Sequence, residues 1–334
     1  MKAAFLVKER TNFEIREIPT PSPQDDEVLV RVKYALITNE DWEITAFQGQ
    51  EGIAGRYFVG EVVGAGPKVK NVTTGEIVSA FPAQPCGECI ECKRDNQPFC
   101  EKPKILGYNT QGILSEYIKV RENYLIKIPT EIPLELGVFV PLVSSLATLI
   151  PHKIEYGVTS ILTADNIEHI IFSHILLNCG IWQIALLSNH NRLRTFVREA
   201  SRIYYTEESS NLYGIVNDLI EKPKLSFELT GDQRNLKCLI RAMPADTTII
   251  IWNKFRQKIS YEPEVLGECT NKELNLTLAN RIPSSFHSNK AIKLILLHEL
   301  NLQDFVTHNI NLSDFSKVNI QSIREPVLML VRMQ

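Results

Sequence analysis

Short runs of apolar and β-branched residues make up most of the first 130 positions, and Pro, Gly, Asn or Asp separates one run from the next. EVLVRVKYALI, FVGEVVGAG and YLIKIP are three of these runs. Such runs, with turn-forming residues between them, are typical of strands, so this part of the chain is predicted to be β-rich with few helices. From about Pro133, the segment LELGVFVPLVSSLATLIPHKI spaces its apolar residues as a helix does.

Strand and helix patterns alternate between about residues 158 and 255. The predicted strands are SILTA, QIALLS, LSFELTG and TTIIIW, and the predicted helices are NIEHIIFSHILLNCG, closed by Gly180, RLRTFVREAS and NLKCLIRAM. This alternation is the pattern of βαβ units around a parallel sheet. From about residue 270 the patterns are mixed again, and they end in the apolar strand VLMLVRM.

Length and charge exclude several classes of protein. A chain of 334 residues favours two domains. The 36 basic and 39 acidic side chains give a net charge of −3, which offers no general attraction to nucleic acid or to anionic lipid. No stretch approaches the roughly 18 apolar residues of a membrane span. The first residues lack the order of a signal peptide, so we expect a cytoplasmic protein with no membrane partner.

One local concentration of positive charge consists of Arg194, Arg198 and Arg202, spaced by four on a predicted helix. Charge runs of this size usually form a solvated helix face, which is the interpretation we favour. A docking patch for an acidic partner is the alternative.

Four of the seven cysteines lie within fifteen residues, in the segment PCGECIECKRDNQPFC. They are Cys86, Cys89, Cys92 and Cys100. Four thiolates can close a tetrahedral shell around one Zn²⁺ and leave no position for substrate, so the lobe 86–100 is predicted to hold one structural zinc. An iron–sulfur cluster is the alternative, because thiolates hold such clusters too. A β-rich setting without a second cysteine cluster favours zinc.

Several further segments resemble the zinc-containing alcohol dehydrogenase family, the medium-chain dehydrogenase/reductases. They are MKAAFLV, GEVVGAGPKVKNVTTGEIVSAFP, ILGYNTQGILSEYIKV, FELTG and VTHNINL. The resemblance implies an α/β chain in which 1–150 and 270–334 form a GroES-like β-rich domain that carries the zinc lobe. Residues 151–269 would then form a Rossmann-type domain with a doubly wound parallel sheet. The resemblance also implies a homo-oligomer, a dimer or tetramer.

The family's ligands for a catalytic zinc do not match this chain. The family has a Cys in CGxD, the His of GHE, and a later Cys or Glu. This chain has TNED, GRY and VPL, which place Thr38, Arg56 and Val140 at those positions and keep only Asp41. Arg is a permanent cation and Val has no lone pair, and residues 1–151 contain no histidine. We therefore assign no catalytic residue and expect Arg56 to take the metal's volume, near Asp41.

The dinucleotide loop departs from the family in a similar way. The family has G-x-G-x-x-G between a strand and a helix, whereas ILTADNIEHII places Ala164, Asn166 and His169 at the glycines. Glycines let the backbone approach the pyrophosphate, and Asp165 and Glu168 add negative charge where a helix N-terminus attracts phosphate. D-x-x-E is also a capping-box-like pattern, so these carboxylates are predicted to take the place of the phosphate. A modified but working loop is the alternative.

The ribose position offers no clear ligand either. QIALL is followed by SNHNRLR, which has no acid to bind a ribose 2′-hydroxyl. Ser188, Asn189 and Arg192 suit either an NADP 2′-phosphate or an ordinary polar turn, and we favour the turn. No cofactor-binding residue is therefore assigned, and NAD(P) is not expected to bind in the family's way.

Three functions are compatible with these features. The leading one is a zinc-binding, alcohol dehydrogenase-like protein without dehydrogenase activity, retained for binding, regulation or structure, with a possible protein partner. The alternative is a zinc-independent NAD(P)-dependent oxidoreductase acting on a small alcohol, carbonyl or enone, with Tyr57 as proton donor and Arg56 polarising a carbonyl. The third is a subunit of a hetero-complex. If the cleft that holds the family's catalytic site binds another small molecule in this chain, Trp42, Tyr57 and Arg56 would line it.

Overall fold

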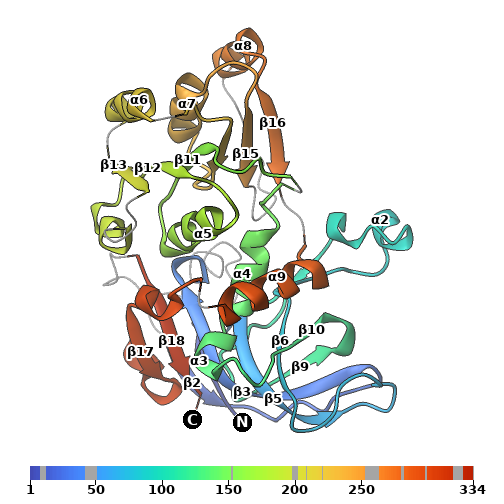
Figure 1. Cartoon of the computed structure of the whole chain (residues 1–334). Helices are drawn as coiled ribbons and strands as arrows, with labels where there is room; N and C mark the ends of the chain where they lie inside the picture. The colour runs from blue at the N-terminus through green and yellow to red at the C-terminus, as the bar shows by residue number, and fades with distance from the viewer. Residues whose placement is uncertain are drawn as a thin grey trace. The chain divides into compact units, whose positions relative to one another are not determined.

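The computed structural model contains two compact units (Figure 1). The first comprises Met1–Ser145 and Ile282–Gln334, and the second comprises Leu146–Arg281. The structure describes residues 1–7, 13–41, 51–151, 153–197, 202–207, 209–219, 221–252, 263–279, 282–297, 299–318 and 326–333. The predicted fold class is confirmed, with a β-rich unit beside a unit built on a parallel sheet.

The first unit is built mainly from antiparallel strands. Its largest sheet has the order β10-β6-β5-β3-β18-β17, with β9 also paired to β3, and smaller sheets have the orders β2-β1-β4 and β7-β8. The strands are β1 Lys2–Leu6, β2 Phe13–Glu17, β3 Glu27–Thr38, β4 Gly52–Ile53, β5 Tyr57–Ala65, β6 Ile77–Ala80, β7 Ala83–Gln84, β8 Lys104–Ile105, β9 Tyr117–Arg121, β10 Leu125–Lys127, β17 His308–Asn311 and β18 Leu328–Arg332.

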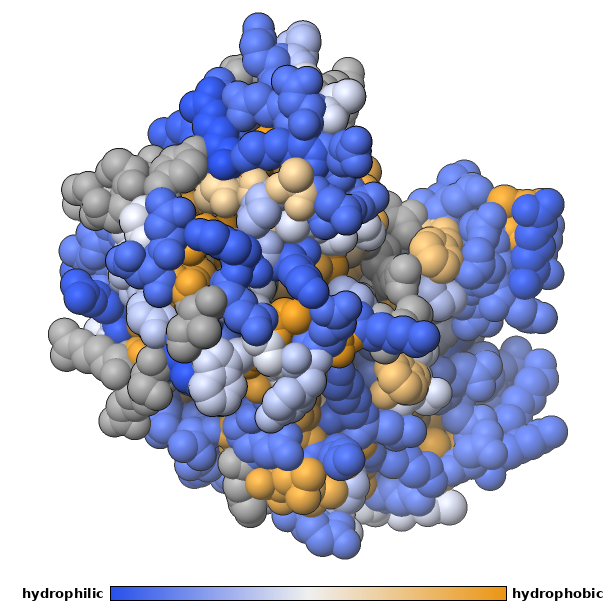
Figure 2. Space-filling view, turned by 45° about the horizontal axis from the view of Figure 1, so that its top comes forward, coloured by the Kyte–Doolittle hydropathy of each residue, from blue (hydrophilic) through white to orange (hydrophobic). Residues whose placement is uncertain are grey.

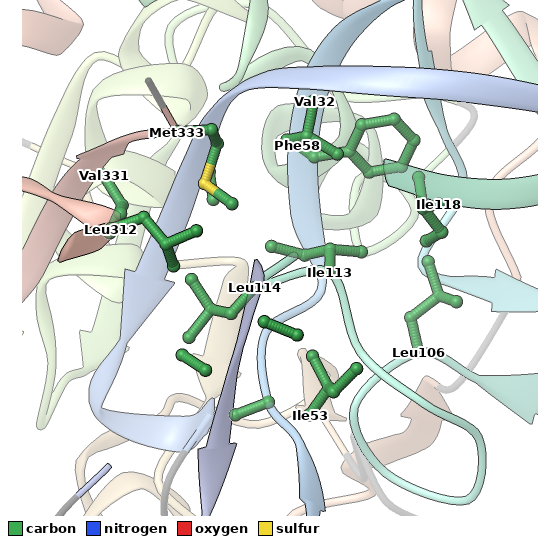
Figure 3. Close-up of a cluster of buried hydrophobic side chains, with 14 of the residues drawn as sticks. Val32, Ile53, Phe58, Leu106, Ile113, Leu114, Ile118, Leu312, Val331 and Met333 are labelled. Atoms are coloured by element: carbon green, nitrogen blue, oxygen red, sulfur yellow. The ribbon is translucent and has the colours of Figure 1, made fainter. Parts of the chain in front are cut away.

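The long strand β3 organises this sheet, because it pairs with β5, β9 and β18. Its alternating pattern places Val28, Val30 and Val32 in the core. Figure 3 shows Val32 beside Phe58 of β5, with Ile113 and Ile118 close by. The strand pattern of the sequence is therefore the pattern of one continuous apolar core.

Short helices connect and cover these strands. They are α2 Ile90–Lys93, α3 Leu134–Gly137, α4 Val140–Ala147, α9 Ser285–Leu296 and the 3₁₀ helices η1 Gln97–Phe99, η2 Glu122–Tyr124, η4 Leu302–Phe305 and η5 Leu312–Lys317. The predicted helical spacing after Pro133 is confirmed by α3 and α4, which a break at Val138 separates.

The second unit is a six-stranded parallel sheet with the order β13-β12-β11-β14-β15-β16. Numbered along the chain, this is the 3-2-1-4-5-6 order of the doubly wound dinucleotide-binding fold. The strands are β11 Thr159–Thr163, β12 Gln183–Leu187, β13 Ile203–Thr206, β14 Leu225–Glu228, β15 Thr248–Trp252 and β16 Asn275–Ala279. Strands β11, β12 and β14 are buried along their whole length, as expected for a sheet covered on both faces.

Helices cover both faces of this sheet. They are α5 Ile167–Asn178, η3 Asn191–Val197, α6 Ser209–Asp218, α7 Gln233–Ala242 and α8 Pro263–Asn271. Leucines of α6 and α7 share one cluster with Ile161 and Ile249 of the sheet. Phe172 of α5 instead packs edge-on against Phe227, with ring centroids 5.0 Å apart. Gly180 follows α5 with a φ of +100°, which confirms its predicted place at the helix end.

We predicted that Arg194, Arg198 and Arg202 lie on one helix, and this prediction is wrong for Arg202. The described segment Asn191–Val197 is a 3₁₀ helix, and Arg194 lies in it. Arg202 follows it and stacks on Trp182, with its guanidinium carbon 5.5 Å from the ring centroid. Arg198 lies outside the described residues. The spacing of the arginines in the sequence did not reveal that Asn191–Val197 is a 3₁₀ helix.

Polar residues cover most of the face shown in Figure 2, and hydrophobic residues on it form small separate patches. Within the described ranges, no helix combines the length and apolar character needed to cross a bilayer.

Lys272 closes the C-terminus of α7. Its Nζ donates to the carbonyl oxygens of Ile240, Arg241 and Met243 at 3.0, 2.7 and 2.9 Å. The last carbonyls of a helix have no partner within the helix and carry its partial negative charge. One ammonium thus satisfies several acceptors and ties α8 to α7.

Replacement of Lys272 by Met should lower the free energy of unfolding by about 1–2 kcal/mol, because charge-assisted bonds to helix carbonyls are lost. Urea unfolding followed by circular dichroism measures this change. Lys224→Met is the matched control, since Lys224 makes only an exposed pair with Glu155 and its loss should have little effect. Equal effects of the two substitutions would show that the cap contributes nothing specific.

Candidate functional site

The four cysteines of the lobe converge on one small volume. Cys92 lies in α2, Cys89 directly precedes α2, and Cys100 directly follows η1. All four sulfur atoms lie within 4.8 Å of one another. The Sγ atoms of Cys86 and Cys92 are 3.9 Å apart, and so are those of Cys89 and Cys100. Zn–S bonds of about 2.3 Å in a tetrahedron place sulfurs about 3.8 Å apart, so these thiols fit such an ion.

The surroundings of the sulfurs also suit a metal. The backbone N–H groups of Cys89 and Cys86 donate to the sulfurs of Cys86 and Cys100 at 3.4 and 3.2 Å. Hydrogen bonds from the backbone of Glu101 and Cys92 lower the pKa of Cys89 to about 6, whereas burial raises the pKa of Cys92 to about 12. Since metals bind the thiolate, a bound cation would supply the charge that the buried Cys92 needs to lose its proton.

The lobe packs against the part of the first unit that begins at Ile282, after the second unit in sequence. Ile282 is buried against Cys92 and Cys100. Its N–H donates to the carbonyl oxygen of Pro98 at 3.1 Å. The metal-binding loop is thereby fixed by a residue nearly two hundred positions away in sequence.

A second site-like cluster surrounds Arg56, whose side chain is only 3% exposed. Its Nε donates to Asp41 Oδ1 at 2.7 Å, and one Nη donates to Thr38 Oγ1 at 3.0 Å. The other Nη lies 3.2 Å from Glu40 Oε2. The N–H of Thr38 also donates to Asp41 Oδ2, at 2.8 Å. The predicted proximity of Arg56 to Asp41 is therefore confirmed, and the guanidinium joins the end of β3 to the start of β5.

The neighbours of this cluster are also buried. Tyr57 is 1% exposed, and the guanidinium carbon of Arg56 lies 4.8 Å from its ring centroid. Val140 is fully buried at the start of α4. Sequence reasoning missed Glu40, although its place beside Asp41 in TNED was the available signal. Trp42 lies outside the described residues.

Within the described ranges, the four lobe cysteines are the one group of three or more Cys, His, Asp or Glu residues whose ligand atoms converge as a metal requires. The Arg56 cluster instead satisfies its carboxylates with a guanidinium. A fixed cation of this kind can neutralise buried acid, but it offers no open coordination position.

The turn from β11 into α5 is closed by the protein's own side chains. Asn166 is the N-cap, and its Oδ1 accepts from the N–H of His169 at 3.0 Å. The ring Nδ1 of His169 lies 3.0 Å from Asp165 Oδ1. We predicted that Asp165 and Glu168 cap this helix, but the N-cap is the next residue, Asn166. An Asn side chain can accept from a first-turn N–H as well as an Asp side chain can. Glu168 is buried in that first turn.

A third carboxylate lies where the sheet order reverses, between β11 and β14. Glu228 accepts from Thr230 N–H, Thr230 Oγ1 and Gly231 N–H at 3.0, 2.6 and 3.1 Å, and from Thr163 Oγ1 at 3.2 Å. Burial raises the pKa of Glu228, although these hydrogen bonds act in the opposite direction. Dinucleotides bind at this switch point in sheets of this order.

The residues considered for a 2′-phosphate lie between the end of β12 and the first turn of η3. Ser188 is buried, its N–H donates to Thr206 at 3.0 Å, and its Oγ accepts from the N–H of His190 at 3.2 Å. Asn189 and Arg192 are exposed. The hydroxyl of Ser188 is thus engaged in holding its own turn.

Comparison with known proteins finds a described domain within the first unit. Residues 24–130 match the alcohol dehydrogenase GroES-like domain. An L-threonine 3-dehydrogenase of Caldanaerobacter subterraneus subsp. tengcongensis is 37% identical over 137 residues, which is 39% of each chain. The aligned stretch thus spans about two fifths of that relative's length.

Solved structures are similar over the whole chain. Galactitol-1-phosphate dehydrogenase from Escherichia coli superposes with a TM-score of 0.87 at 17% identity and covers 100% of both chains. A short chain alcohol dehydrogenase from E. coli CFT073, in complex with NADH, gives a TM-score of 0.86 at 19% identity and covers 100% of this chain and 99% of the other. At such identities the likeness establishes the fold.

Replacement of Arg56 by Met should lower the free energy of unfolding by about 3 kcal/mol or more, because Asp41 would keep a buried charge without its cation. Urea unfolding of Arg56→Met, Asp41→Asn and the double variant forms a thermodynamic cycle. The double variant should cost clearly less than the sum of the single variants. Additive costs would show that the two side chains do not stabilise each other.

Glu228 should give the protein a characteristic dependence of stability on pH. Its folded-state pKa is raised above the ordinary 4.5, so its contribution to stability is full below that value and is lost as pH rises through the folded-state pKa. Glu228→Gln should flatten the fall in the free energy of unfolding above about pH 4.5 relative to the native chain. Urea titrations from pH 4 to 9 measure it, with the exposed Glu221→Gln as control. Identical dependence of stability on pH in the native chain and in both variants would contradict the raised pKa of Glu228.

Proposed function

We propose that the chain is a zinc-binding member of the medium-chain alcohol dehydrogenase family without dehydrogenase activity, retained as a binding, regulatory or structural protein. The match of residues 24–130 to the alcohol dehydrogenase GroES-like domain supports the family. The single observation that carries the proposal is the buried cluster of Arg56 with Asp41 and Glu40. A permanently charged side chain stands at the position that the family resemblance gives to a zinc ligand.

The chemistry of that cluster supports the proposal directly. Alcohol oxidation on a catalytic zinc needs a metal that polarises the substrate oxygen through an open coordination position. Arg56 carries positive charge, but Asp41, Thr38 and Glu40 already engage its donors. Val140, with no donor atom, is buried at the other ligand position.

The second unit supports the same conclusion from its own side chains. A pyrophosphate binds a helix N-terminus through free N–H groups and positive potential. At α5, Asn166 already accepts from the N–H of His169. Asp165 and Glu168 flank this cap, and Glu228 lies at the switch point. These carboxylates oppose an incoming anion, so weak or absent binding of NAD(P) is expected.

We further propose that Cys86, Cys89, Cys92 and Cys100 hold one structural Zn²⁺. Such an ion would fix the lobe and neutralise its thiolates, and its four sulfur ligands would leave no position for substrate. The protein contributes the clustered sulfurs, their N–H donors and the packing of Ile282.

The test is a titration of purified, zinc-replete protein with NADH and NADPH by calorimetry, combined with metal counting. One zinc per chain and no binding at millimolar nucleotide are expected. Cys100→Ser should lose the zinc, because three thiolates remain, and should leave the nucleotide result unchanged. The NADH-binding relative from E. coli CFT073 serves as the positive control.

Other outcomes would decide against the proposal. Micromolar nucleotide binding would favour a zinc-independent NAD(P)-dependent oxidoreductase, in which buried Tyr57 would have to become accessible as a proton donor. Two zinc ions per chain would place a metal beside Arg56 and overturn our interpretation of that cluster.

A further inference from the structure

The first unit contains a cavity of about 440 Å³ away from the Arg56 cluster. Residues of β9 line it, together with Pro19 and Pro21. Apolar side chains of Leu106 and Ile118 contribute to its lining, and both also belong to the core shown in Figure 3. A volume of this size lies within the range of binding pockets in folded proteins.

The strand β9 presents an unpaired edge to this cavity. Its only pairing among the described strands is with β3. Just beyond its two ends, Glu116 accepts from Val32 and the N–H of Glu122 donates to Asp26, each at 2.9 Å. Backbone groups of an antiparallel strand alternate in direction, so those of Lys119 point away from β3.

The two prolines of the lining do not pair with that edge. Pro19 and Pro21 have no N–H to donate, and so cannot complete a ladder with β9. Ser115 satisfies only the carbonyl of Tyr117, with its Oγ at 2.9 Å. Within the described ranges, no other strand pairs with the outward N–H and C=O groups further along β9, which suit an added strand.

Charge around the cavity is positive although the chain as a whole carries −3. Lys104, Lys119 and Arg121 line it, and so do the carboxylate of Glu27 and the thiol of Cys86, one of the four proposed zinc ligands. Glu27 is paired with Lys119 at 2.9 Å. Arg121 lies 4.0 Å from its nearest carboxylate, Asp26, with both side chains about half exposed. Lys104 and Arg121 thus remain to attract negative charge.

We propose that this cavity binds an extended, acidic peptide segment of a partner protein, which adds a strand to the free edge of β9. Backbone hydrogen bonds to Lys119 and Arg121 would give affinity, an apolar side chain would enter the cavity, and flanking carboxylates would contact Lys104 and Arg121. The proposal is independent of whether the chain binds nucleotide, because every residue involved lies in the first unit.

The test uses a fluorescein-labelled hexapeptide of alternating valine and glutamate and measures anisotropy with the full-length, zinc-replete protein. Saturable binding that weakens between 50 and 500 mM salt is expected. Lys104→Glu combined with Arg121→Glu should weaken binding at least about tenfold, because two attractive charges become repulsive. Lys290→Glu combined with Lys293→Glu makes the same change in net charge on α9, outside the cavity, and should leave binding unchanged.

A second peptide distinguishes strand addition from simple charge attraction. The same hexapeptide with alternate amides N-methylated keeps its charge and loses the donors and the room needed for a ladder, so it should not bind. Equal binding of the methylated peptide would overturn the proposal, as would equal loss in both charge variants. Binding of octanoate without any binding of the hexapeptide would assign the cavity to small carboxylates and would also overturn it.

Discussion

The burial of a guanidinium that cannot lose its charge constrains the whole junction between β3 and β5. Arg56 has water access of only a few per cent, so each of its faces must find a partner within the protein. Asp41 and Glu40 supply the charge, Thr38 supplies an oxygen, and Tyr57 supplies a ring face. These partners hold the end of one strand against the start of the next.

The parallel sheet of the second unit meets a related constraint at its carboxyl edge. Free N–H groups at the start of α5 and at the turn after β14 must be satisfied. In this chain Asn166 satisfies the first and Glu228 satisfies the second. Because both acceptors belong to the protein, the N–H groups that they bind need no external anion. We propose that these internal acceptors take the place of a phosphate at this edge.

The remaining candidate chemistry lies in the first unit and concerns binding. Four clustered thiols suit a metal that maintains structure, and the open edge of β9 with its positive rim suits a peptide. A scaffold of this kind can lose its chemistry and still recognise a partner, because recognition uses surfaces that catalysis did not require.

The sequence by itself determined the local features. The alternation in β3, the run of βαβ patterns and the cysteine spacing follow from short-range periodicity. The βαβ patterns gave β11, β12, β14 and β15 but missed β13 and α6. Sequence also placed Arg56 near Asp41, because family resemblance aligned them. Only the tertiary structure decided that Glu40 completes that cluster, that Asn166 rather than Asp165 caps α5, and that Asn191–Val197 is a 3₁₀ helix. The contact of Glu40 with Arg56 depends on which side chains meet after packing, and local pattern carries no information about it. The cap and the winding of η3 are local, but the residue pattern there allows more than one conformation.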